Sequence, residues 1–179
     1  DGTAAWDYAS RNIGAVGNSI KVVVIDSDAN QQVTLAGAIQ SAGVQAGSLI
    51  QNSAGTKSAY IHKITGSTVV DVIWVSGGAW TTSDLVDDGS NPDVAITAVA
   101  DWYDSQMITP TLNWNQVAPQ PGTSVHVAER GGSNDEMHIV VVDVDGGVTG
   151  TPNTVLEKFL YVSKASDGKS AEGSLVYYP

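Results

Sequence analysis

Two apolar runs stand out in the pattern of hydrophobic and polar positions along the chain. Residues 20–26 (IKVVVID) and 136–145 (EMHIVVVDVD) each place several β-branched residues in succession. Continuous runs of this length, bounded by turn residues, are typical of strands that are buried on both faces. We therefore predict a strand in each segment, and for 20–26 burial on both faces, as in a central strand of a sheet.

Further strands are predicted where short apolar segments lie between turn residues. Residues 60–64 and 69–75 are typical strands, joined by a hairpin-like turn at 65–68 (TGST). Shorter strands are expected at 124–128, 156–163 and 174–178. A short helix is the alternative for 156–163, and the pattern at 33–39 is ambiguous.

One longer helix is predicted, over residues 93–103 (DVAITAVADWY). Asn91 suits the N-cap, Pro92 the first helical position, and Asp93 the positive end of the helix dipole. A single helical turn is expected at 6–11. Three prolines within 109–122 indicate an exposed loop or arm.

The composition changes this picture toward β-structure. Val occurs 24 times and Ile 11 times, against 7 Leu, and β-branched side chains favour pleated surfaces over helices. We predict an α+β fold, a β-rich mixed domain with a central sheet and one or two helices. The length of 179 residues predicts a single domain over 1–179, and both ends look cut from a longer chain.

The charge narrows the classes of partner. Eight Lys and Arg residues face 19 Asp and Glu residues, which gives a formal net charge of -11. Such a chain repels phosphate backbones and anionic lipid surfaces, so neither nucleic acid nor a membrane is an expected partner. Cysteine is absent, which excludes disulfides, a thiolate nucleophile and a Cys-ligated zinc site. No apolar run approaches the roughly 18 residues of a membrane span.

Candidate chemistry is sparse. The three histidines, His62, His126 and His138, lack metal-site spacing, and no nucleophile elbow or phosphate-binding loop is present. Two aspartate pairs end the two strongest strands. They are Asp26 with Asp28 and Asp143 with Asp145. If those strands are neighbours, the four carboxylates form a cluster suited to a cation or to acid–base work. We favour the simpler interpretation that these residues end strands and start turns, and we expect no enzyme, cofactor or metal site.

Four of the five tryptophans are assigned by their local context. Trp74 lies within a predicted strand and Trp102 within the predicted helix, so we expect both in the core. Trp80 and Trp114 lie in loop-like segments and are the candidate interface residues.

Two stretches are more specific than composition. They are RNIGAVGNSIKVVV, from residue 11 to 24, and IVVVDVDGGVTGTPNTVLEKFLYVSKASDGKSAEGSLVYY, from residue 139 to 178. Together they resemble the contractile tail sheath protein of T4-like bacteriophages. The positions that match are Gly17, Asn18, Lys21, Asp143, Gly150, Thr151, Glu157, Phe159, Ser163, Lys164, Asp167, Gly168, Lys169, Tyr177 and Tyr178. The resemblance is strong over about a third of the chain and vague between Asp28 and Glu136.

The resemblance implies a structural function. Sheath subunits polymerise around a tail tube and contract to drive it into the host cell, so the implied partners are other sheath subunits, the tail tube and the baseplate. No small-molecule substrate is implied, and the expected location is the virion tail, after assembly in the host cytoplasm. Sheath proteins are several times longer, so the chain is expected to be an internal segment that is monomeric or weakly associating alone. The alternative is a secreted β-rich module that binds calcium or carbohydrate through its aspartate pairs and exposed tryptophans.

Overall fold

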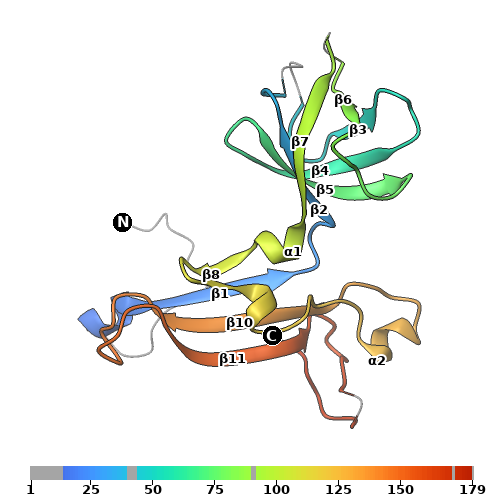
Figure 1. Ribbon diagram of the computed structural model, residues 1–179. Helices are drawn as coiled ribbons and strands as arrows, with labels where there is room; N and C mark the ends of the chain where they lie inside the picture. Colours follow the sequence, from blue (N-terminus) through green and yellow to red (C-terminus); the bar gives the residue numbers. More distant parts are fainter. Residues whose placement is uncertain (1–13, 40–43, 90–91, 171, 179) are drawn as a thin grey trace, which may run out of the picture. The chain divides into compact units, whose positions relative to one another are not determined.

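The chain forms two compact units, each of which is described by itself (Figure 1). The computed structural model describes residues 14–39, 44–89, 92–170 and 172–178. The barrel unit comprises Ser27–Met107 and Asn113–Pro119, and the sheet unit comprises the remaining segments. The prediction from sequence was one domain. The described residues are mainly β-strands with few short helices, so the β-rich class is confirmed, while the barrel was not anticipated.

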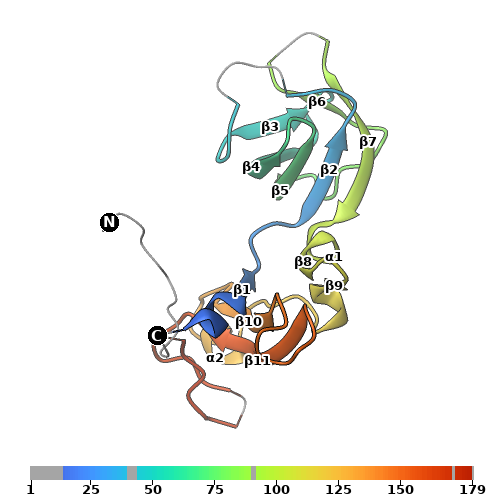
Figure 2. The same ribbon diagram turned by 90° about the vertical axis from the view of Figure 1, so that its left-hand side faces the viewer.

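Six antiparallel strands close into a barrel in the order β2-β5-β4-β3-β6-β7 (Figure 2). They are β2 (Gln31–Leu35), β3 (Leu49–Asn52), β4 (Ser58–Thr65), β5 (Val69–Ser76), β6 (Leu85–Asp87) and β7 (Val94–Asp101). The predictions of strands at 60–64 and 69–75 and of a turn between them are confirmed, and the ambiguous segment at 33–39 begins as the end of β2. Strands β3 and β6 were missed, because they are only four and three residues long.

Side chains fill the barrel interior. Strand β2 buries alternate residues, Gln31, Val33 and Leu35, as a strand with one inward face must. The interior cluster also contains Ile50, Ala59, Ile61, Val70, Val72, Trp80, Val86, Val94 and Ile96. Closure removes the free edges of the sheet, so every barrel strand has a hydrogen-bonded neighbour on each side.

The helix predicted at 93–103 is wrong, because this segment forms β7 followed by the one-turn helix α1 (Trp102–Ser105). Val94 and Ile96 are buried and the residues between and after them are exposed, which shows the two-residue period of a strand. Asp101 is the true N-cap, and its side chain accepts hydrogen bonds from the backbone N–H groups of Tyr103 and Asp104. Pairing with β2 and β6 closes the barrel and outweighs the local helix signals.

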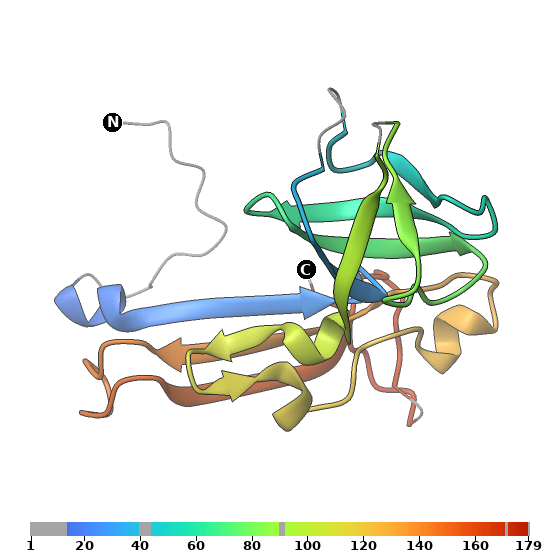
Figure 3. The ribbon, with the colours of Figure 1, turned by 45° about the horizontal axis from the view of Figure 1, so that its top comes forward.

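The sheet unit is built on three antiparallel strands in the order β1-β10-β11 (Figure 3). These are β1 (Ile20–Asp26), β10 (Glu136–Asp143) and β11 (Thr154–Ser163), preceded by the 3-10 turn η1 (Ala15–Ser19). Both strands predicted from apolar runs are confirmed, and they are neighbours, with β10 in the centre. The central position and two-faced burial predicted for 20–26 are wrong, because β1 lies at an edge of the sheet and only Ile25 on it is buried. β11 is confirmed as a strand, where a short helix was the alternative.

Other predictions for the second half of the chain differ from the structure. The strand predicted at 124–128 is wrong, because Ser124 caps the one-turn helix α2 (Val125–Ala128) by accepting from the Val127 N–H. Only isolated bridges occur at 174–178. The segment 109–122 contains β9 (Leu112–Asn113), the 3-10 turn η2 (Trp114–Gln116) and the last residue of β8 (Met107–Thr109), and Trp114, Ala118 and Pro121 in it are buried. The turn expected at 6–11 lies outside the described residues.

Candidate functional site

The antiparallel register separates the two aspartate pairs that sequence analysis placed together. Asp26 is opposite Met137 at one end of β10, whereas Asp143 is opposite Ile20 at the other end. Six residues of strand separate these positions, which corresponds to about 20 Å at the rise of a β-strand. The hypothesis of a four-carboxylate cluster is therefore wrong.

Asp143 instead forms a buried node at one end of β10. Its carboxylate accepts hydrogen bonds from the Ser19 hydroxyl, from the backbone N–H groups of Val148 (3.0 Å) and Thr149 (2.7 Å), and from the Thr149 hydroxyl (2.9 Å). The Ser19 hydroxyl in turn accepts from the Gly147 N–H at 2.9 Å. The node thus ties the start of β1 to the loop between β10 and β11.

The hydrogen bonds of this node determine the charge state of Asp143. Burial alone would raise the pKa of this carboxyl, but the donors from Ser19, Thr149 and Val148 outweigh burial and lower the pKa well below its ordinary value of 3.8. The side chain is therefore an anion at neutral pH, and all of its partners are donors. Asp143 is therefore a buried, structural carboxylate whose negative charge is stabilised by hydrogen-bond donors.

A second buried carboxylate lies immediately before the other end of β10. Asp135 accepts from the Ser124 N–H (2.8 Å) and hydroxyl (2.9 Å), and from the Ser163 hydroxyl (2.5 Å). Burial opposes ionisation, but these hydrogen bonds lower the pKa of Asp135 below 3.8. The N-terminus of α2 and the end of β11 are thereby fastened to the start of β10.

The residues that carry the sheath resemblance all belong to the sheet unit. Gly17 and Asn18 lie in η1, Lys21 in β1, and Asp143 at the end of β10. The others lie in or after the β10–β11 loop, namely Gly150, Thr151, Glu157, Phe159, Ser163, Lys164, Asp167, Gly168, Lys169, Tyr177 and Tyr178.

Within this set, Ser163 is the centre of the contacts at the end of β11. It is fully buried, its backbone accepts from the Tyr178 N–H at 2.9 Å, and it forms a bridge with Tyr177. Gly168 packs so closely that a Cβ there would lie 2.6 Å from the Ser163 Cβ. Lys164 forms an ion pair with Asp26 at 2.7 Å. Glu157 and Phe159 are exposed on β11, so the resemblance combines buried nodes with surface positions.

The tryptophans do not lie where sequence analysis placed them. Trp80 and Trp114, the candidate interface residues, are each only 1% exposed. Trp102 is buried as expected, whereas Trp74, also expected in the core, is 38% exposed. The interface assignment of Trp80 and Trp114 is therefore wrong.

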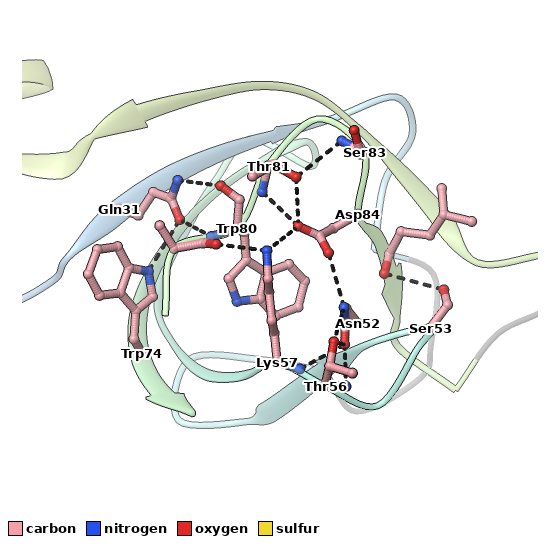
Figure 4. Close-up of polar contacts among 12 residues, drawn as sticks. Gln31, Asn52, Ser53, Thr56, Lys57, Trp74, Trp80, Thr81, Ser83 and Asp84 are labelled. Carbon is pink, nitrogen blue, oxygen red and sulfur yellow. Dashed lines mark hydrogen bonds and ion pairs between the residues drawn. The ribbon is translucent and has the colours of Figure 1, made fainter. Parts of the chain in front are cut away.

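A polar network holds Trp80 inside the barrel (Figure 4). The Gln31 side chain donates to the Trp80 carbonyl (2.8 Å) and accepts from the Trp80 N–H (2.9 Å) and the Trp74 indole N–H (3.2 Å). Lys57 donates to Asp84 (2.7 Å) and to a backbone carbonyl of the same loop (2.8 Å). Burial alone would raise the pKa of Asp84, but Lys57, Thr81 and Asn52 lower it far below 3.8. The network fixes the loop between β5 and β6.

The histidines are dispersed. His62 lies 4.0 Å from Asp28, His126 lies 3.3 Å from Asp167, and the buried His138 accepts from the Tyr161 N–H at 3.0 Å. No group of three or more potential metal ligands occurs among the described residues. In the same part of the chain, no helix has the length and apolar character needed to cross a membrane.

Sequence analysis missed Ser19, Asp135 and Gln31, which organise the nodes and the barrel network. Ser19 was within reach, because it lies between the matched residues Asn18 and Lys21. Asp135 and Gln31 carried no sequence signal, since their partners lie between 11 and 49 residues away.

The chain matches no protein-family model, and comparisons with curated proteins and with solved structures find no match.

Proposed function

We propose that the chain is a structural subunit of a phage contractile tail sheath, which polymerises around the tail tube and contracts to deliver the genome into the host cell. Its partners would then be other sheath subunits, the tail tube and the baseplate, and it would be located in the virion tail after assembly in the host cytoplasm. The proposal assigns no reaction, cofactor or small-molecule substrate to it.

The observation that carries the proposal is where the resemblance lies in the fold. Every matched position belongs to the sheet unit, and the barrel unit falls within the segment from Asp28 to Glu136, apart from Ser27, where the resemblance is vague. Insertion of a compact unit between two strands of another is compatible with both folds when the junctions are connecting segments. The matched positions therefore all lie in one folded unit, which supports the resemblance being a property of that unit.

The build of the sheet unit suits a mechanical subunit. Asp143 and Asp135 fasten both ends of the central strand to β1, β11 and α2, which favours movement of the unit as one body. Contraction needs subunits that change their mutual contacts while each stays folded. Repeated contacts between different surfaces of identical subunits generate helical assemblies.

The test is negative-stain electron microscopy of the natural full-length protein. We expect striated tubes of uniform diameter, alone or on tail tubes. Phe159→Ser alters a matched residue that is 46% exposed and is expected to impair polymerisation while the protein stays folded. Val99→Ser, at a position of the barrel that is 38% exposed, is the matched control and should polymerise normally.

Discrete particles at every concentration would contradict the proposal and favour the alternative of a secreted binding module. That alternative relied in part on exposure of Trp80 and Trp114, which are buried. It would be tested by titration with glycans and by a rise in Tm on addition of calcium.

A further inference from the structure

A row of large apolar side chains crosses the outer surface of the barrel. Leu49 on β3 is opposite Tyr60 on β4, and Tyr60 is opposite Ile73 on β5. Opposed residues of an antiparallel pair share a face, and these three are 49%, 46% and 38% exposed. Single exposed apolar residues are ordinary, but a contiguous set is characteristic of a binding surface.

A hollow of about 290 Å³ adjoins this row. It lies where β3 is next to β6, with Gln51 opposite Asp87. Its lining is formed by Val44, Leu49, Ile50, Gln51, Asp87, Asp88 and Gly89. Leu49 belongs to both features, so the row and the hollow form one continuous surface. We call this the β3–β6 surface.

The lining of the hollow combines aliphatic side chains with carboxylates. Val44 and Leu49 supply aliphatic surface, while Asp87 supplies an exposed carboxylate. The barrel unit as a whole contains eight aspartates against two lysines, and Lys57 is already paired with Asp84. The charge that complements this hollow is therefore positive.

We infer that the β3–β6 surface binds a partner protein that inserts a Lys or Arg side chain into the hollow and lays neighbouring apolar side chains on the row. Lys and Arg carry an aliphatic stem and a charged head, which match a lining that contains the aliphatic side chains of Val44 and Leu49 and the carboxylate of Asp87. Aromatic and aliphatic anchors next to a charge-assisted hydrogen bond form the centre of many protein interfaces. The equivalent barrel of a second copy carries the same excess of aspartates and would repel this surface, so the occupant is a different, basic protein. Contacts between copies through the sheet unit are not affected by this charge. The inference rests on the barrel alone and not on the proposed function.

The probe is a library of random 12-residue peptides selected on the full chain, with counter-selection on the double variant Leu49→Ser/Asp87→Asn. We expect selected peptides to contain Lys or Arg beside Leu, Ile, Phe or Tyr. Binding of a selected peptide should weaken at least tenfold in the double variant and several-fold when salt rises from about 0.05 to about 0.5 M. Labelled-protein NMR should place the perturbed signals on Leu49, Tyr60, Ile73 and Asp87.

Two matched controls remove similar groups elsewhere. Val99→Ser removes an exposed apolar side chain from another barrel strand, and Asp145→Asn removes an exposed carboxylate from the sheet unit. Both should bind the peptide as the wild type does, and melting curves verify that every variant is folded. Selection of peptides without basic residues, equal loss of binding in the controls, or self-association of the chain through Tyr60 and Leu49 would overturn the inference.

Discussion

At the scale of single residues, Trp80 illustrates how burial depends on distant partners. It lies in a loop, yet Gln31 binds both its backbone N–H and its carbonyl and its side chain is 1% exposed. The ion pair of Lys57 with Asp84 and close packing at Gly77 hold the loop between β5 and β6 in its conformation. A side chain from a loop thus completes the barrel interior.

The glycine pair before Trp80 provides a test at this scale. Both Gly77 and Gly78 have positive φ, of 73° and 71°, but only Gly77 lies against other backbone, where a Cβ would meet the Thr56 carbonyl and approach the Lys57 Cα to 2.9 Å. Gly78→Ala should cost about 1–2 kcal/mol in the free energy of unfolding, from left-handed strain alone. Gly77→Ala should cost about 1–3 kcal/mol more, from overpacking. Equal losses in urea denaturation would contradict the close approach.

At the scale of elements, the ends of the central strand β10 depend on buried carboxylates as well as on strand pairing. Asp143 faces only donors, namely two backbone N–H groups and the hydroxyls of Ser19 and Thr149. An amide at this position would direct its NH₂ group at one of those donors. The charge of Asp143 is therefore part of the fold of the loop that follows.

This charge predicts how stability depends on pH. The pKa of Asp143 is lower in the folded chain than its ordinary value of 3.8, so the unfolded state binds more protons as the solution is acidified. The stabilisation is present above pH 3.8 and is lost as pH falls through the folded pKa. Asp143→Asn should lower Tm at pH 7, and its difference from wild type should shrink below pH 3.8. Thermal melts by circular dichroism between pH 2 and 7 measure this.

The matched control is Asp145→Asn, two residues further along the chain, where the side chain is exposed. It should melt within a degree or two of the wild type at pH 7, because exposed carboxylates contribute little to stability. A variant at Asp143 with the same melting curve as this control would show that the node does not stabilise the sheet.

At the scale of the whole molecule, the chain is divided into two units that are interleaved in sequence. The barrel unit has a closed interior centred on Trp80, and the sheet unit has its own hydrogen-bonded nodes at Asp143 and Asp135. Units with separate interiors commonly unfold as separate cooperative transitions.

Calorimetry tests this division. Trp80→Ala should lower the free energy of unfolding of the barrel unit alone, by about 3–5 kcal/mol, because it leaves a cavity. Asp143→Asn should lower the transition temperature of the sheet unit alone. A single transition that both substitutions shift equally would show that the chain unfolds as one cooperative body.

The sequence by itself determined the strands predicted at 20–26, 60–64, 69–75 and 136–145, the last of which ends two residues earlier, at Asp143, because dense β-branched runs bounded by turns favour extended backbone wherever they lie. It also indicated the adjacency of β1 and β10 as a possibility to be tested. Only the tertiary structure decided that Asp26 and Asp143 lie at opposite ends of β10. No local sequence pattern shows whether a neighbouring strand runs parallel or antiparallel. The tertiary structure likewise decided the strand at 94–101 and the burial of Trp80, because closing the barrel satisfies backbone groups and fills an interior that no local pattern reveals.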